Sequence, residues 1–226
     1  MENLNPFKLF YNRIYHYLFI EKFNKKLDIQ FPSNLYRWDL IQYIINKYSF
    51  ENYLEIGCDK DQSFSKIKVK NKVGVDPVSG GTIRDTSDNF FKRNNNKFDL
   101  IFIDGLHHYN QVIKDIYNSL KVLNKNGFIL VHDCLPRSIA HQAVPRYRGS
   151  WNGDVWKSIV ELRTNPKLDT YTCQIDFGVG VIIDRNNTDL LDYKVSDFSK
   201  LRFKDYYYNH DKFMRIIDYD KLLKII

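Results

Sequence analysis

Short apolar segments that end in a polar residue or a glycine alternate with amphipathic helical segments, and this alternation constrains the fold more than any other feature. The sequence predicts strands over 53–57, 72–77, 99–105, 128–133, 171–176 and 178–184. It predicts helices over 36–48, 108–123 and 154–163. Such alternation indicates βαβ units around a mostly parallel sheet. The short link between the last two strands predicts a hairpin, with an antiparallel strand at one edge of the sheet.

Four of the predicted strands end in residues suited to ligand binding. These residues are Glu55 and Gly57, Asp76 and Pro77, Asp104 and Gly105, and His132 and Asp133. In open α/β sheets, ligands bind beyond the carboxyl ends of the strands. Gly57 lets the backbone approach a ligand closely, and Asp76 can accept hydrogen bonds from both hydroxyls of an adenosine ribose. We expect residues 58–63 to form a loop that leads into a helix, with peptide groups that face the cofactor.

The loop after the first predicted strand argues against two common nucleotide-binding folds. A dinucleotide-binding fold needs the pattern GxGxxG, whereas residues 57–61 read GCDKD and contain one glycine. The P-loop pattern GxxxxGK[ST] does not occur in the sequence. Enzymes that use nicotinamide, flavin or a P-loop nucleotide are therefore disfavoured.

Several segments together resemble one family of class I S-adenosylmethionine-dependent methyltransferases. They are YLEIG, VGVDP, TSDNFF, FDLIFIDGLHHYNQVIKDIYNSLKVL, GFILVHDCLP, SWNGDVWKSIVELR and DFGVGVI. The family is a small O-methyltransferase-like group associated with gene clusters for sugars, glycans and natural products. The resemblance covers residues 36–184 and implies a Rossmann-like, seven-stranded, mostly parallel sheet whose last strand is antiparallel, with helices on both faces.

The resemblance assigns cofactor-binding roles to residues along these strand ends. They are Glu55, Gly57 and Cys58 in the first motif, Asp76 and Pro77 at the ribose, Ser87 and Asp88 beside the adenine, and Asp104 near the methionine part and the transferring methyl group. Ser87 can alternatively cap a helix. The chain departs from the family where a second glycine is common, because it has Asp59 and Asp61 there.

Transfer of a methyl group to a hydroxyl requires removal of the hydroxyl proton, for which histidine is suited. The candidate bases are His108 and His132, followed by His107, with Asp104 beside them. His108 can instead cap the helix that follows it. A second option is a divalent cation such as Mg²⁺, held by Asp104, His132 and Asp133, which would lower the pKa of the acceptor hydroxyl.

The segment SWNGDVWK predicts an acceptor site. Trp151 and Trp156 can stack on a sugar face, and Asn152 and Asp154 can hydrogen-bond to its hydroxyls. The alternative is a helix start capped by Asn152 or Asp154, with Trp156 in the core. The preceding segment, residues 135–153, is basic and includes Arg148, and it is a candidate substrate lid that binds phosphate or carboxylate.

Charge, cysteine count and hydropathy argue against nucleic-acid binding, a zinc site and membrane insertion. The net charge of +7 permits an anionic partner, but the basic residues are spread along the chain, which favours a solvated surface and makes nucleic acid an unexpected partner. Three cysteines without paired spacing predict neither a disulfide framework nor a zinc site. The sequence contains no signal-peptide pattern and no long apolar run, so we expect a cytoplasmic protein without membrane insertion.

The chain is expected to form a single methyltransferase domain over residues 1–226. Its parts are an N-terminal helical segment over 1–50, a cofactor-binding core over 51–184 that includes the candidate lid, and a C-terminal extension over 185–226. Two alternatives remain open: a methyltransferase that acts on RNA or protein, and a degenerate fold used for binding or assembly. In the second alternative the aromatic segments 1–30 and 200–226 serve as interaction surfaces, for example in a homodimer.

Overall fold

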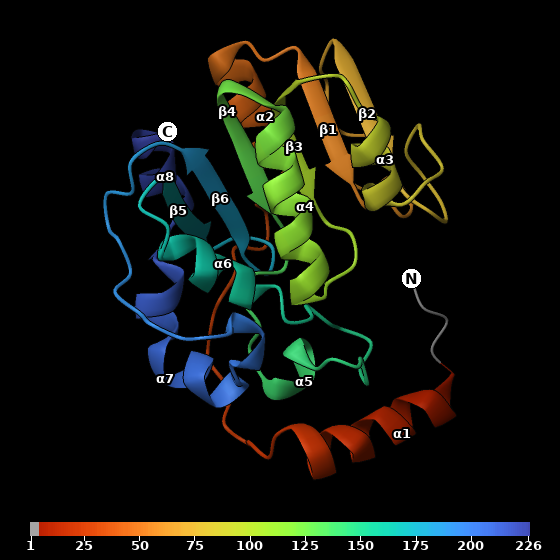
Figure 1. Ribbon diagram of the computed structural model, residues 1–226, viewed down its shortest axis with the longest axis vertical. Helices are drawn as coiled ribbons and strands as arrows, with labels where there is room; N and C mark the ends of the chain where they lie inside the picture. The colour runs from red at the N-terminus through yellow and green to blue at the C-terminus, as the bar shows by residue number, and fades with distance from the viewer. Residues whose placement is uncertain (1–4) are drawn as a thin grey trace.

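The computed structural model describes residues 5–226, in which one sheet is flanked by helices (Figure 1). The strands are β1 (Asn52–Ile56), β2 (Asn71–Val75), β3 (Phe98–Ile103), β4 (Leu123–Val131), β5 (Leu168–Cys173), β6 (Val179–Asp184) and β7 (Ile216–Ile217). The helices are α1 (Pro6–Tyr15), η1 (His16–Ile20), α2 (Arg37–Tyr48), α3 (Ser87–Arg93), α4 (Tyr109–Val122), α5 (Ile139–Gln142), α6 (Trp156–Arg163), η2 (Phe198–Lys200), α7 (Phe203–Met214) and α8 (Tyr219–Ile225).

The seven strands form one mostly parallel sheet in the order β2-β1-β3-β4-β6-β5-β7. β6 is antiparallel to both of its neighbours, β4 and β5, and the other paired strands are parallel. The prediction of seven mostly parallel strands is therefore confirmed. The antiparallel strand is β6, which corresponds to the predicted strand over 178–184, the last of the predicted core. Its expected place at an edge is wrong, because β6 lies inside the sheet between β4 and β5.

Alternate side chains of the central strands pack into two separate cores, one on each face of the sheet. Ile101 and Ile103 of β3 point to the face covered by α3, α4, α6 and α7, whereas Leu100 and Phe102 point to the face covered by α2 and α8. This follows from the two-residue period of a strand, which turns successive side chains to opposite faces. Strands buried on both faces need continuous apolar runs, and FDLIFI is such a run.

Two expectations for the loops beyond the strands are wrong. Residues 59–66 form successive turns and no helix follows the first strand, because Asp59 and Asp61 take positive φ angles of 45° and 60° that a helix does not allow. The resemblance places Ser87 and Asp88 directly after the family's third strand, and so implies a strand before Ser87. Only one isolated bridge, between Ile83 and Val75, occurs there, and the seventh strand is instead β7, from the C-terminal segment.

The terminal segments lie around the sheet in different ways. Residues 203–226 supply α7, β7 and α8, and their side chains enter both cores. The N-terminal helix α1 lies at the foot of the molecule and extends away from the sheet (Figure 1). The predicted aromatic segment 1–30 begins with residues 1–4, which lie outside the described residues. None of the described helices is both long and apolar enough to cross a membrane.

Candidate active site

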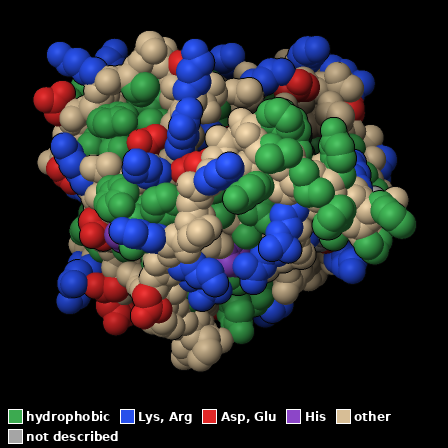
Figure 2. Space-filling model, turned by 90° about the horizontal axis from the view of Figure 1, so that it is seen from below, with side chains coloured by type: hydrophobic (Ala, Val, Ile, Leu, Met, Phe, Trp, Pro, Cys, Tyr) green, Lys and Arg blue, Asp and Glu red, His purple; other side chains and the backbone are tan. Residues whose placement is uncertain are grey.

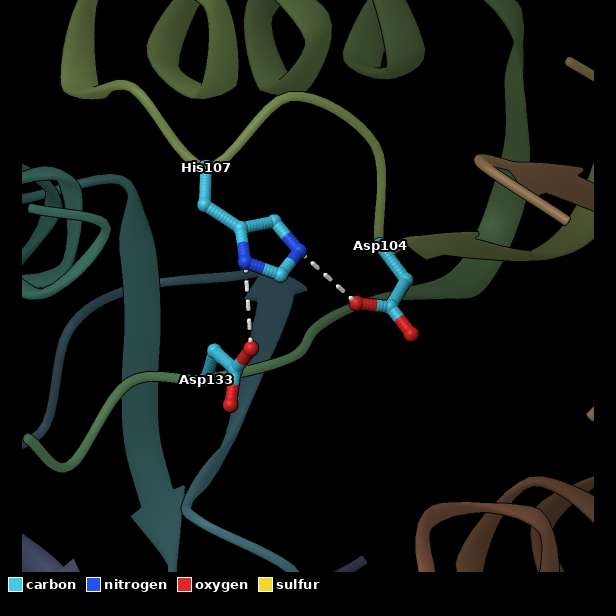
Figure 3. A group of neighbouring side chains, drawn as sticks. All are labelled: Asp104, His107 and Asp133. Carbon is cyan, nitrogen blue, oxygen red and sulfur yellow. Dashed lines mark hydrogen bonds and ion pairs between the residues drawn. The ribbon is translucent and has the colours of Figure 1, made fainter. Parts of the chain in front are cut away.

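Charged side chains from two loops meet beyond the carboxyl ends of β3 and β4. Asp104 follows β3, His132 and Asp133 follow β4, and His107 comes from the loop between β3 and α4. Parallel strands end at the same edge of a sheet, so residues that directly follow them are brought together. Figure 3 shows the His107 ring between the carboxylates of Asp104 and Asp133.

His107 bridges the partly buried carboxylate of Asp104 and the buried carboxylate of Asp133. Its Nε2 lies 3.2 Å from Oδ1 of Asp104, and its Nδ1 lies 3.1 Å from Oδ2 of Asp133. Burial lowers the pKa of His107, but the two carboxylates outweigh burial and raise it above its usual value. Nδ1 is buried and, among the described residues, no acceptor lies at the angle of a hydrogen bond to it. This nitrogen therefore has a lone pair or proton to offer to a ligand.

His132 is held as a cation. Its Nδ1 lies 3.1 Å from Oδ1 of Asp104, and its Nε2 lies 2.7 Å from the carbonyl oxygen of Asp176. Both ring nitrogens thus face acceptors, which favours the doubly protonated ring. Burial opposes the charge, but the carboxylates of Asp104 and Asp133 raise the pKa of His132 well above its usual value. A ring in this state donates hydrogen bonds and does not take up a proton.

The sequence did not single out Arg37 and Asp176, which complete the charged cluster. Oδ2 of Asp176 accepts hydrogen bonds from Nη1 of Arg37 at 2.8 Å and from its backbone N–H at 3.1 Å. Nε of Arg37 lies 3.5 Å from Oδ2 of Asp104. Arg37 begins α2, far from the strand ends in sequence, so no local pattern could have pointed to it. Asp176 lies in the turn between β5 and β6, where Asp176, Phe177 and Gly178 take three consecutive positive φ angles. In the sequence, only Gly178 marked this turn.

The loop after β1 lies against the loop after β3. Gly57 has a φ of +87°, and a Cβ at this position would lie 2.3 Å from the carbonyl oxygen of Asp104. The glycine is therefore required by the protein backbone itself. Asp59 and Asp61 take the left-handed conformation that glycines commonly supply. Asp59 and Asp61 therefore replace the family's glycine without changing the backbone conformation that glycine allows. Asp61 also links this loop to the one after β2, because its Oδ1 accepts the N–H of Gly81 at 2.7 Å.

Asp76 is ionised and organises the loops around the end of β2. Its Oδ2 accepts the N–H of Asp59 at 3.0 Å, and its Oδ1 accepts the N–H groups of Val78 and Ser79 at 2.8 and 2.9 Å. Burial opposes ionisation, but these donors outweigh it and lower the pKa of Asp76. A carboxylate offers about four acceptor positions, so a further hydroxyl can be accepted. Pro77, the next residue, is exposed.

Glu55 and Cys58 are buried behind the first loop. Oε2 of Glu55 accepts the hydroxyl of Tyr53 at 2.5 Å, and burial raises the pKa of Glu55 to about 8. Glu55 is therefore mostly neutral at pH 7. Burial also raises the pKa of the Cys58 thiol far above its usual range. Both residues support the loop from beneath it.

Ser87 and Asp88 face the neighbouring helix α4. Gln111 donates hydrogen bonds to both side chains at 3.2 Å, and Nζ of Lys114 lies 2.6 Å from Oδ2 of Asp88. The expectation that Ser87 caps the helix is wrong by one residue, because Thr86 is the N-cap and accepts the N–H of Asn89.

His108 and Trp151 lie at the outer side of the cluster. His108 is the N-cap residue of α4, but its side chain makes no capping hydrogen bond. Trp151 stacks on His107, with ring centroids 5.3 Å apart, and contacts His108 edge-on at 5.9 Å. The guanidinium of Arg146 lies 5.3 Å from the centroid of Trp151. The indole therefore packs against protein groups and fixes the orientation of His107.

Asn152 and Asp154 are engaged with the protein, whereas Arg148 is exposed. Asn152 is buried and donates to Oδ1 of Asp133 at 2.7 Å. Asp154 accepts the N–H of Tyr109 at 2.7 Å. Asp154 therefore caps α4, and the expected capping of α6 by Asn152 or Asp154 is wrong. Trp156 is buried in the core, as the alternative interpretation predicted. In the segment 135–153, only residues 148–150 are exposed.

Asp104, His107 and Asp133 bring ligand atoms within 4.8 Å of one another, as a metal site requires. The predicted set had His132 where the structure has His107. The difference has a physical cause, since Nε2 of His132 faces the carbonyl oxygen of Asp176 and Nδ1 is taken by Asp104. The buried Nδ1 of His107, which has no hydrogen-bond partner among the described residues, and the carboxylate of Asp133 beside it fit a divalent cation.

Comparison with known proteins agrees with this geometry. Residues 48–134 match the family described as a methyltransferase domain. This segment runs from the end of α2 to the residue after Asp133, and it contains Gly57, Asp76 and the three candidate metal ligands. No curated protein matches the sequence.

Solved methyltransferases have the same fold. The O-methyltransferase from Bacillus cereus in complex with SAH is 10% identical, with a TM-score of 0.51 over 78% of this chain and 97% of that one. The SAH-bound methyltransferase PaMTH1 from Podospora anserina is 17% identical, with a TM-score of 0.51 over 66% of this chain and 78% of that one. At these identities the likeness is one of fold.

Proposed function

Because this chain carries a methyltransferase domain of the class I fold, we propose that it transfers a methyl group from S-adenosylmethionine to a hydroxyl oxygen of a small molecule. The observation that carries the proposal is the partly buried cluster of Asp104, His107 and Asp133 at the ends of β3 and β4. It lies at the same edge of the sheet as Asp76, whose ionised carboxylate suits an adenosine ribose.

The cofactor would bind across the ends of β1, β2 and β3. Asp76 has an acceptor position left for a ribose hydroxyl, and the peptide groups of residues 57–61 follow the path that glycines usually allow. Ser87 and Asp88 lie at the start of α3, on the adenine side in this proposal. Asp104 lies on the methionine side, and its backbone packs against Gly57.

The chain's own residues align the acceptor and receive its proton. Methyl transfer from a sulfonium is an in-line displacement, so the acceptor oxygen must be fixed opposite the leaving sulfur. His108 is our candidate base, because no carboxylate of the described residues forms an ion pair with it, unlike His107 and His132. His132 and Arg37 keep Asp104 and Asp176 ionised and in place.

We further propose that Asp104, His107 and Asp133 hold a divalent cation such as Mg²⁺. The ligand set combines two carboxylates and one imidazole nitrogen that has no other partner in the described part of the chain. When bound, such a cation stabilises negative charge on an acceptor oxygen. Asn152, through its hydrogen bond to Oδ1, would leave Oδ2 of Asp133 directed toward the ligand.

The acceptor that we propose is a sugar or another hydroxylated small molecule, modified in the cytoplasm. Arg148 is the one predicted acceptor-binding residue whose side chain is exposed, and it suits an anionic group on the acceptor. Trp151 and Asn152 would act by holding His107 and Asp133.

Calorimetric titration with S-adenosylmethionine tests the cofactor half of the proposal. We expect saturable binding that the Asp76→Ala variant weakens. Incubation with radiolabelled cofactor and a panel of sugars and phenols tests the transfer half, with His108→Ala as the variant expected to retain cofactor binding and lose transfer. An absence of binding at millimolar cofactor would overturn the proposal.

A further inference from the structure

The N-terminal helix carries its apolar face outward. Asn12 and His16 are buried against the body of the protein. Phe7, Phe10 and Leu18, which share the opposite side of the helix, are 86%, 65% and 57% exposed. A surface helix normally buries its apolar stripe and exposes its polar one, so this arrangement is inverted.

Polar and aromatic contacts from the segment 135–153 hold the helix in this orientation. The side-chain amide of Asn12 donates to the carbonyl oxygen of Arg146 at 2.7 Å. The His16 ring contacts the Tyr147 ring edge-on, with centroids 5.4 Å apart. The orientation is therefore set by specific contacts, and the outward stripe is what the fold leaves for another partner.

The charge of this region favours an anionic surface over a second copy of the chain. Residues 5–22 contain three bases, Lys8, Arg13 and Lys22, and one acid, Glu21. The Glu21 carboxylate accepts the backbone N–H groups of Phe203 and Lys204, at the start of α7. Figure 2 shows hydrophobic side chains gathered among Lys and Arg side chains on the face seen from below, toward the right, where α1 lies. Two basic helices repel each other, whereas a bilayer with anionic lipids attracts them.

A groove beside the helix also suits lipid. It has a volume of about 450 Å³, and Phe10, Ile14 and Leu18 line it together with Tyr147. Arg13 and Lys22 also line it, as does Glu21, whose carboxylate accepts two backbone N–H groups at the start of α7. Apolar groups and cations for a headgroup therefore lie together. Tyrosine rings, such as those of Tyr11 and Tyr17 on the helix, favour the headgroup level of a bilayer.

We propose that α1 and η1 lie flat on the surface of an anionic phospholipid bilayer, with the outward apolar stripe inserted among the headgroups. A helix with aromatic residues on one side and basic residues nearby binds in the plane of the interface and does not span the membrane. This docking is independent of the proposed methyl transfer, and it would place the segment 135–153 close to the lipid.

Vesicle co-sedimentation of the full chain tests the proposal. We expect binding to phosphatidylcholine vesicles that contain phosphatidylglycerol, much weaker binding without it, and a loss at high salt. The variant Phe7→Ser/Phe10→Ser/Leu18→Ser should lose about tenfold or more in affinity, because each side chain contributes apolar area. Arg13→Glu/Lys22→Glu should also weaken binding.

Matched controls keep the outcome decisive. Leu190→Ser/Ile225→Ser removes exposed apolar side chains elsewhere, and Lys70→Glu removes an exposed cation; both should bind as the wild type does. Circular dichroism and cofactor titration establish that each variant is folded. Equal vesicle binding by the stripe variant and the wild type would overturn the proposal. So would a lipid-free dimer in light scattering that the stripe variant abolishes, because the stripe would then be covered by a second copy.

Discussion

Gly57 lies so close to Asp104 that a Cβ on residue 57 would stand 2.3 Å from the Asp104 carbonyl oxygen. The two residues follow β1 and β3, which are neighbours in the sheet. Through this contact, the loop after β1, which would hold the cofactor, packs against Asp104, a member of the charged cluster. A change at either position is therefore expected to reach both halves of the site.

Replacing Gly57 with alanine should destabilise the fold. Its φ of +87° costs an alanine about 1–2 kcal/mol, and the clash with Asp104 adds to that cost. Urea unfolding should show a clear loss of stability, and calorimetry should show weaker cofactor binding. Gly149→Ala is the control, since nothing lies within 4 Å of its added Cβ; an equal loss in both variants would contradict the steric argument.

Replacing Asp76 with alanine should lower affinity for S-adenosylmethionine by about tenfold or more, because a charged hydrogen-bond acceptor for the ribose contributes about 1.5–3 kcal/mol. The control is Asp99→Ala at the other end of the sheet. Asp99 also accepts backbone N–H groups, from Glu51 and Asn52, so its loss should cost stability but leave the affinity unchanged. If both variants bound the cofactor with the same affinity, Asp76 would not bind the ribose.

Glu55 should make the stability depend on pH. Its pKa is raised from 4.5 to about 8, so the folded state keeps a proton that the unfolded state releases. Below pH 4.5 both states carry the proton, and Glu55 does not change the free energy of unfolding with pH. Between pH 4.5 and pH 8 the free energy of unfolding falls by about 1.4 kcal/mol per pH unit, and above pH 8 it is again independent of Glu55 titration. Urea unfolding at several pH values should show Glu55→Gln gaining on the wild type across this window. Parallel stability curves would rule out a buried neutral glutamate.

Replacing Arg37 with methionine should destabilise the protein by about 3–5 kcal/mol, because it removes one of the two cations that Asp104 and Asp176 share and leaves only His132 between them. Lys70→Met, which breaks the exposed pair with Glu51, should cost about 0–1 kcal/mol. Chemical unfolding of both variants gives the comparison. Similar small losses would mean that solvent, and not Arg37, compensates the two carboxylates.

Mn²⁺, used as a spectroscopic probe for a divalent cation, should bind the wild-type protein. His107→Ala and Asp133→Asn should each lower the affinity by about tenfold or more, as expected when a ligand is lost. Asp197→Asn, which changes an acid in the C-terminal segment away from the cluster, is the control. Mn²⁺ affinity that is the same in all variants would show that the cluster is an ion-pair network only.

Much of the fold was readable from local patterns. The apolar runs and polar ends of β1 to β4 follow from residues next to one another in sequence, and so do the helical periods of α2, α4 and α6. Gly57, Asp76, Asp104 and Asp133 were identified for the same reason, because a parallel sheet carries all its strand ends to one edge.

The tertiary structure decided what lies between those elements. The sequence by itself determined which segments form strands and helices, and which residues reach the rim, because hydrophobic period and strand-end chemistry are local properties. The choice of His107 over His132 as a candidate ligand, the entry of Arg37 and Asp176 into the cluster, and the place of β6 inside the sheet depend on contacts between distant segments. The same holds for the outward face of α1, since an amphipathic pattern does not say which side meets the protein.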